Sequence, residues 1–265
     1  MWRMEGGEKT KGRLASPFAD DYSGRLPAVL RALPSAMPWP LSPLETLWCA
    51  VALAAGYAVR GAAGFGSGVV VAPLLAFVLP LSTIAPVITV IGLLVALGQA
   101  VKDWPLIRWR ELAVFVPGSL VGVALGVFVF QAIDPASLAR WLGAYVLLYA
   151  LYSLAGERLL GGAPRMPRWA VHPLAAAGAL VATVFGGLAG PIYVTWFDAQ
   201  RLSKTVFRVT VATTLLVLGL MRSAAYLAGG VFRAQDWALI AGALLPVAVG
   251  TVIGDRLHDR MDPAA

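Results

Sequence analysis

The sequence predicts an all-α membrane protein with about eight transmembrane helices (seven to nine) in two related halves. Three observations lead to this prediction. Apolar residues make up 59% of the chain and charged residues only 13%, whereas soluble domains carry about 25% charged residues. Apolar segments long enough to cross a bilayer follow one another, and each half contains a glycine-rich interruption. Too few polar side chains remain to cover a water-soluble surface, which argues against a soluble enzyme or a nucleic-acid-binding protein.

Residues 1–42 differ from the rest of the chain. They carry charges of both signs and end in several prolines, a composition typical of a poorly ordered tail. Met37 begins a segment that would be a natural start for a membrane protein. An alternative interpretation is therefore that the first 36 residues are a mis-assigned upstream extension.

From residue 43 onward, apolar segments of roughly 20 residues can each cross the hydrocarbon core as a helix. We expect such helices near 43–60, 83–101, 111–131, 138–156, 171–187, 205–228 and 236–253. Two further segments, 61–80 and 186–200, begin with glycines, which are poor helix formers. Each of these is expected to contain a short helix and either to cross as a broken helix or to enter and return.

The two halves resemble each other. "GFGSGVVVAPLLAF" is echoed by "FGGLAGPIYVTWF", which carry Pro73 and Pro191 respectively, and "GSLVGVALGVF" is echoed by "GALLPVAVGTVIG" at nearly the same offset. We therefore divide the chain into a first repeat (43–156), a basic loop (157–170) and a second repeat (171–265). Weak internal symmetry with a broken segment in each half is typical of secondary transporters.

The loop charges favour one of two topologies. Lys and Arg are concentrated in the loops at 102–110, 157–170 and 201–208 and at the C-terminal end. If both glycine segments cross, nine spans place all of these on one side, which is then cytoplasmic, and the repeats are inverted. If the segments are re-entrant, seven spans place the 201–208 cluster on the opposite side. Crossing is favoured.

Glycines recur every four residues in two of the expected helices. A stripe of this kind lets another helix approach closely, so we expect helix packing rather than substrate binding. The stripes comprise Gly118, Gly122 and Gly126 in the first half, and Gly242, Pro246, Gly250 and Gly254 in the second.

The glycine segments themselves are candidates for an anion site. Backbone N–H groups at the start of a helix converge on one spot, where the helix dipole adds positive potential. Two such segments, one from each half, could face each other and hold an anion. The alternative is that the glycines only permit tight packing. The glycines concerned are Gly61, Gly64, Gly66 and Gly68, and Gly186, Gly187 and Gly190.

Charged residues near the apolar segments are few. Arg60 and Arg208 could supply positive charge to an oxyanion, with Thr210 as a hydroxyl donor, or they could reach out to a membrane face. For Arg222, which lies late in its segment, reaching the membrane face is the favoured interpretation. Glu45 and Asp198 are candidate proton carriers if transport is proton-coupled.

Neither a metal centre nor a catalytic site is predicted. The chain has one cysteine, Cys49, and two histidines, His172 and His258, far apart in the sequence and without nearby acidic clusters. It also lacks any recognisable nucleophile–base motif. No cofactor is expected.

The stretch "GAAGFGSGVVVAPLLAFVLPLSTIAPV", together with "FGGLAGPIYVTWF" and "VFRVTVATTLLV" in the second half, resembles the TauE/SafE sulfite exporter family over roughly residues 44–254. The resemblance implies an inner-membrane, multi-pass permease for small sulfur-containing or organic anions, such as sulfite or an organosulfonate. The family's glycines correspond to Gly64, Gly66, Gly68, Gly187 and Gly190, and its prolines to Pro73 and Pro191.

These lines together predict a secondary transporter of a small anion, and the alternative is a membrane scaffold or assembly protein that transports nothing. Expected partners are the anion and the lipid bilayer, without nucleic acid; proton coupling and homo-oligomerisation stay open. The predicted substrate-binding residues are Arg60, Gly64, Phe65, Gly66, Gly68, Pro73, Gly187, Gly190, Pro191, Arg208 and Thr210.

Overall fold

A computed structural model describes residues 41–102, 104–159, 167–198 and 204–261. These ranges contain nine α-helices and two short 3₁₀ turns, and no strand occurs in them. The helices are α2 (Pro43–Ala63), α3 (Ser67–Leu75), α4 (Leu81–Lys102), α5 (Trp109–Ala132), α6 (Pro135–Leu159), α7 (Val171–Phe185), α8 (Gly190–Asp198), α9 (Lys204–Ala228) and α10 (Ala234–Met261). The predicted tail lies almost entirely outside the described residues, as does the middle of the basic loop at 157–170.

Five of the described helices are long and apolar enough to cross a membrane, namely α2, α4, α5, α9 and α10, and α7 is a shorter apolar helix. The outer faces of α2, α5 and α10 carry large apolar side chains that are exposed in the structure, including Val51, Leu120, Leu125 and Leu245. Lipid tails would cover such a surface in a bilayer. The all-α, multi-spanning fold class predicted from the sequence is therefore confirmed at this level.

Glycines form the turns that precede the two short helices, α3 and α8. Helix α2 begins with a capping box, in which the Ser42 N–H donates to Glu45 Oε2 (2.8 Å), and it ends where Gly64 takes a left-handed conformation (φ 83°). Gly66 repeats this conformation (φ 96°) directly before α3. In the second half, Gly186 and Gly187 (φ 77° and 106°) separate α7 from α8. Residues other than glycine rarely adopt a positive φ, so these positions turn the chain at defined points.

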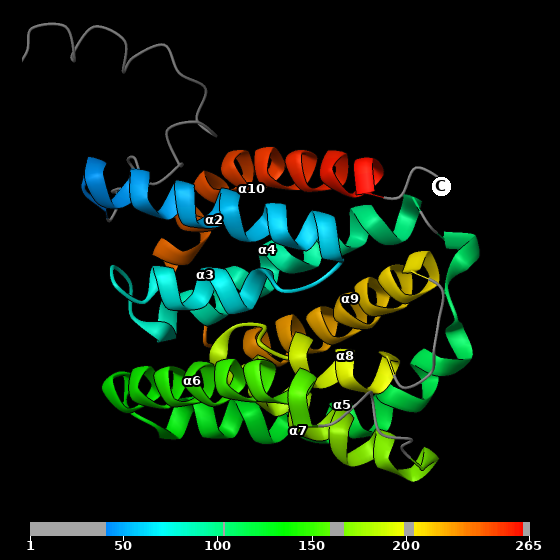
Figure 1. The fold of residues 1–265 in the computed structure, drawn as a ribbon. Helices are drawn as coiled ribbons and strands as arrows, with labels where there is room; N and C mark the ends of the chain where they lie inside the picture. The colour runs from blue at the N-terminus through cyan, green and yellow to red at the C-terminus, as the bar shows by residue number, and fades with distance from the viewer. Residues whose placement is uncertain (1–40, 103, 160–166, 199–203, 262–265) are drawn as a thin grey trace, which may run out of the picture. The chain divides into compact units, whose positions relative to one another are not determined.

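The order long helix, short helix, long helix, long helix occurs twice, as α2–α5 and as α7–α10. In each set, the last helix packs against the first helix of the other set. Helix α10 lies along α2, with Gly250 against Ala54 and Gly254 against Ala58 (Figure 1). Because the residue numbers rise together along the contact, the two helices run parallel.

Helix α5 lies along α7 in the same manner. A Cβ atom on Gly122 would lie 2.1 Å from the carbonyl oxygen of Ala176, and one on Gly126 would lie 2.6 Å from Cβ of Thr183. Here too the numbers rise together, so the pair is parallel. Gly118, Gly122 and Gly126 in the first predicted stripe, and Gly250 and Gly254 in the second, therefore lie directly against the backbone or Cβ atoms of a partner helix, whereas Gly242 is exposed.

Helices α4 and α9 cross each other in antiparallel directions. Gly219 of α9 lies opposite Leu93 of α4. One turn farther along α9, Arg222 reaches back to Thr89. This crossing brings the two sets of helices together near the middle of α4.

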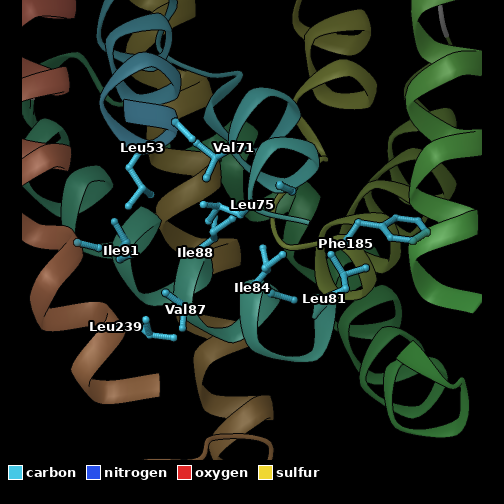
Figure 2. Close-up of a cluster of buried hydrophobic side chains, with 14 of the residues drawn as sticks. Leu53, Val71, Leu75, Leu81, Ile84, Val87, Ile88, Ile91, Phe185 and Leu239 are labelled. Carbon is cyan, nitrogen blue, oxygen red and sulfur yellow. The ribbon is translucent and has the colours of Figure 1, made fainter. Parts of the chain in front are cut away.

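The short helices belong to the protein interior. Val71 and Leu75 of α3 are buried in an apolar cluster with Leu53 of α2 and Ile84 of α4 (Figure 2). In α8, Phe197 is buried in a second cluster. Irregular backbone beside these helices is thus enclosed by protein, which is the condition under which a membrane tolerates it.

Candidate functional site

The two glycine turns contact each other. A Cβ atom on Gly68 would lie 2.6 Å from the carbonyl oxygen of Gly187, and one on Gly190 would lie 3.1 Å from the ring of Phe65. A Cβ atom essentially never lies within 3.0 Å of such an atom, so at Gly68 only glycine fits without moving the backbone. The sequence places these turns in different halves, and the fold brings them side by side.

A small cavity lies beside this contact. Its volume is about 40 Å³, measured as the space open to the centre of a water molecule. By the same measure one water needs roughly 10–15 Å³, so the cavity has room for a few waters or one compact ion. The residues that line it come from both turns and from the α4–α9 crossing: Arg60, Gly66, Ser67, Gly68, Ile88, Thr89, Gly92, Leu93, Gly186, Gly187, Gly190, Leu215, Leu218, Gly219 and Arg222.

Two arginine side chains line this cavity. Arg60 comes from the last turn of α2 and Arg222 from α9, and each is only 4% exposed. Nε and Nη2 of Arg60 and Nε of Arg222 have no hydrogen-bond partner among the described residues. Leaving charged donors buried and unpaired is costly, and these guanidinium N–H groups could be satisfied by an anion in the shared cavity.

Neighbouring groups hold both guanidiniums in place. Arg60 Cζ lies 6.0 Å from the ring centroid of the buried Tyr57, and Arg222 Cζ lies 5.9 Å from that of Tyr226. Arg222 Nη2 also donates to Oγ1 of Thr89. The tyrosines are neutral, so these contacts orient the arginines without neutralising them.

The short helices add further positive potential. Gly66 and Gly68 at the start of α3, and Gly190 at the start of α8, all line the cavity. The first N–H groups of a helix lack intrahelical partners, and the helix N-terminus carries partial positive charge. Two helix N-termini therefore meet at the two arginines. Among the described residues that line the cavity, none is Asp, Glu or His.

Five of the residues predicted from the sequence line the cavity: Arg60, Gly66, Gly68, Gly187 and Gly190. Gly64 does not; it ends α2 and packs against Arg208. Phe65 packs edge-on against Phe207, with ring centroids 6.4 Å apart. These residues support the turn from outside the cavity.

Four other predicted residues have different surroundings. Arg208 is paired with Asp255 of α10, with Nη2 and Oδ1 2.8 Å apart, and does not line the cavity. Thr210 is buried and donates to the carbonyl of Val206. Pro73 lies within α3, half-buried. The side chain of Pro191 lies outside the described residues.

Sequence reasoning assigned Arg222 to the membrane face, and the structure corrects this. Helix α9 continues to Ala228, so Arg222 lies more than one turn inside it, at the height where α4 crosses. A signal was present in the sequence: Gly219 precedes Arg222 by three residues and leaves space on the same face. Ser67 and Thr89 were also missed, because hydroxyl residues in apolar helices give no distinctive pattern.

Of the two candidate proton carriers, Glu45 lies apart from the cavity. Glu45 caps the start of α2 through Ser42. The side chain of Asp198 lies outside the described residues.

Comparison with protein families identifies the chain. Residues 48–265 match the family described as sulfite exporter TauE/SafE. The chain belongs to the TauE/SafE family. It is also 26% identical, over 162 residues, to the probable inner membrane transporter protein TsaS of Comamonas testosteroni. That alignment covers 60% of this chain and 66% of the relative, so the chain spans just under two thirds of the relative's length. No solved structure matches.

The TauE/SafE match confirms the resemblance seen in the glycine segments, because it extends through both of them. Family membership and the apolar helices together make the chain a multi-pass inner-membrane protein of a transporter family. This agrees with the localisation predicted from the sequence.

Proposed function

We propose that this TauE/SafE protein is a secondary transporter of a small oxyanion, sulfite or a small organosulfonate, and that the anion binds in the cavity between the glycine turns. The observation that carries the proposal is the pair of buried guanidiniums, Arg60 and Arg222, whose unpartnered N–H groups belong to one cavity without an acidic residue among its described lining. The name of the family supports the sulfur oxyanion as substrate.

The chemistry of the cavity suits an oxyanion. Guanidinium presents N–H donors in a planar fork that matches two oxygens of one anion, and it stays charged in any environment. The backbone N–H groups at the starts of α3 and α8 and the Ser67 hydroxyl add neutral donors. An anion at this point offsets the desolvation of both arginines, which no described residue does.

We further propose that both glycine segments cross the membrane, so that the chain has nine crossings in two inverted repeats (43–156 and 171–265). The indole N–H of Trp48 donates to the carbonyl of Leu74 (2.8 Å), which supports α3 running back toward the side where α2 begins. The antiparallel crossing of α4 and α9 supports it too. If α8 crosses, the chain reverses its direction five times between α4 and α9, which makes them antiparallel; if α8 were re-entrant, it would reverse only four times and they would be parallel.

This topology agrees with the charges. The loop at 102–110 then shares one side with Arg256 and Arg260, and the other side carries only Arg140 and Arg233 among the described basic residues near helix ends. Positive residues remain in the cytoplasm, so the 102–110 side is cytoplasmic.

The test is anion flux into proteoliposomes that contain the full chain. Uptake of radiolabelled sulfite, sulfoacetate and sulfate is measured with and without a pH gradient, which also tests proton coupling. We expect saturable uptake of at least one of them. In Arg60→Gln and Arg222→Gln, KM rises by about 10- to 100-fold, because a hydrogen bond to a charged group contributes about 1.5–3 kcal/mol.

The matched control is Arg256→Gln, which removes the same charge from an exposed position on α10 and should leave KM unchanged. Equal KM values for all three variants would contradict the assigned site. No saturable flux of any anion, from protein that is monodisperse and folded, would contradict transport itself and favour the scaffold alternative.

A further inference from the structure

The charge balance of the cavity has a consequence for how the transporter completes its cycle. Arg60 and Arg222 are both permanently charged. Their described neighbours are neutral: the Tyr57 and Tyr226 rings and the Thr89 hydroxyl.

The carboxylate that is linked to the first glycine turn through Arg208 already has a partner. Asp255 is paired with Arg208, which packs on Gly64 outside the cavity. Asp236 of α10 accepts from the backbone N–H of Arg233 and does not line the cavity either. Without an anion, the site therefore carries two positive charges that no described side chain balances.

Net transport by alternating access requires the protein to change conformation around this site in both the loaded and the unloaded form, whereas exchange requires it only in the loaded form. Each uncompensated ion in a low-dielectric interior costs several kcal/mol, and closing the site around two of them without water adds that cost to the barrier. A bound dianion removes it. The loaded form therefore changes conformation much faster than the unloaded form.

We propose that the protein is an obligatory anion exchanger, in which the return step requires a second anion bound from the opposite side. The proposal rests on the proposed function, since it concerns the same cavity. In such an exchanger the driving force is the gradient of a counter-anion across the membrane and not a proton gradient. The described lining of the cavity agrees with this, because it holds no carboxylate or imidazole that could carry a proton.

The test compares exchange with net efflux in proteoliposomes of the full chain. Vesicles loaded with radiolabelled sulfite are diluted into unlabelled sulfite or into gluconate. Valinomycin with equal potassium on both sides holds the membrane potential at zero, so that charge accumulation cannot slow net efflux. We expect efflux into sulfite to be at least about tenfold faster, a ratio that needs only about 1.4 kcal/mol of additional barrier for the unloaded form.

Variants test whether charge is the cause. Arg222→Gln leaves one positive charge, so the ratio of exchange to net efflux should fall toward one, and Arg60→Gln provides the same test if the first variant does not fold. Arg222→Lys keeps the charge and should keep a high ratio, as should Arg256→Gln.

Equal efflux into sulfite and gluconate by the wild-type protein overturns the proposal while leaving transport intact. A high ratio that persists in both glutamine variants overturns the charge argument. Absence of saturable sulfite uptake is a different result, because it removes the proposed function as well.

Discussion

Replacing one glycine in each parallel helix pair tests the packing from which the fold is built. In Gly122→Ala, the new Cβ would lie 2.1 Å from the carbonyl oxygen of Ala176, and in Gly250→Ala it would lie 2.3 Å from that of Ala54. Both obstacles are backbone atoms of a neighbouring helix, so no side-chain rotation can relieve the overlap. The helices must separate by roughly 1 Å, which already forfeits a quarter to a half of the dispersion attraction of the atoms concerned.

The expected cost follows from two opposing terms. Overpacking a close contact costs about 1–3 kcal/mol, and we expect the upper part of that range because the backbone cannot yield. Alanine in place of glycine in a helix returns about 1 kcal/mol. Each variant should therefore be destabilised by about 2 kcal/mol, which corresponds to a fall of roughly 4–8 °C in melting temperature.

Gly143→Ala is the matched control. A Cβ atom there meets nothing within 4 Å, so the substitution keeps only the gain in helix propensity. The assay is the melting temperature of detergent-purified protein, followed by loss of the monodisperse peak in size-exclusion chromatography. If Gly122→Ala melts at or above the wild-type temperature, then α5 and α7 do not pack in this register and the reasoning is refuted.

Three further predictions concern topology, an ion pair and a helix cap. In a background without the native cysteine, Ala136→Cys and Arg256→Cys should react with an impermeant maleimide from opposite sides of the membrane; labelling from the same side would favour a re-entrant second glycine segment (186–200). Asp255→Asn should lower the melting temperature while KM for the anion stays unchanged, because Arg208 binds Asp255 and does not line the cavity; a raised KM would return Arg208 to the site. Hydrogen bonds from Ser137 lower the pKa of Asp134 at the start of α6, so its stabilising contribution is present at neutral pH and disappears as the pH falls through that lowered pKa. The difference in melting temperature between wild type and Asp134→Ala should therefore shrink on acidification, and a constant difference would contradict this assignment.

Much of the fold followed from features that each segment carries by itself. Length and apolarity predicted the membrane-spanning helices, and the glycines predicted where α2 and α7 would end. Family resemblance rested on the same glycines. Arg60 was found because a charged residue beside an apolar segment and a glycine turn is rare enough to be examined singly.

The internal repeat was predicted from two pairs of similar motifs, and one pair was partly misleading. Pro73 and Pro191 suggested equivalent positions, but Pro73 lies late in α3 and Pro191 near the start of α8. The second pair, the glycine motifs of α5 and α10, occupies corresponding places in the structure, because α5 packs on α7 through its glycines as α10 packs on α2. A proline is tolerated at several points of a short helix, whereas a glycine pressed against backbone has no substitute.

The roles of the arginines show where sequence reasoning stops. Arg208 and Arg222 lie on the same helix, each near one end, and sequence favoured Arg208 for the site. In the structure Arg208 pairs with the carboxylate of Asp255 in α10. Arg222 lines the cavity and donates a hydrogen bond to Thr89, which is 133 residues away in the chain.

The sequence by itself determined an all-α membrane protein of the TauE/SafE family, the places where its helices break, and one of the two arginines that line the cavity. Those properties depend on the composition and periodicity of single segments. Only the tertiary structure decided that Arg222 and not Arg208 lines the cavity, and that the two glycine turns touch. It also decided that the last helix of each set packs against the first helix of the other set. The physical reason is that the partner of a charged side chain depends on which helix packs beside it at that level of the fold, and that helix comes from a distant part of the chain.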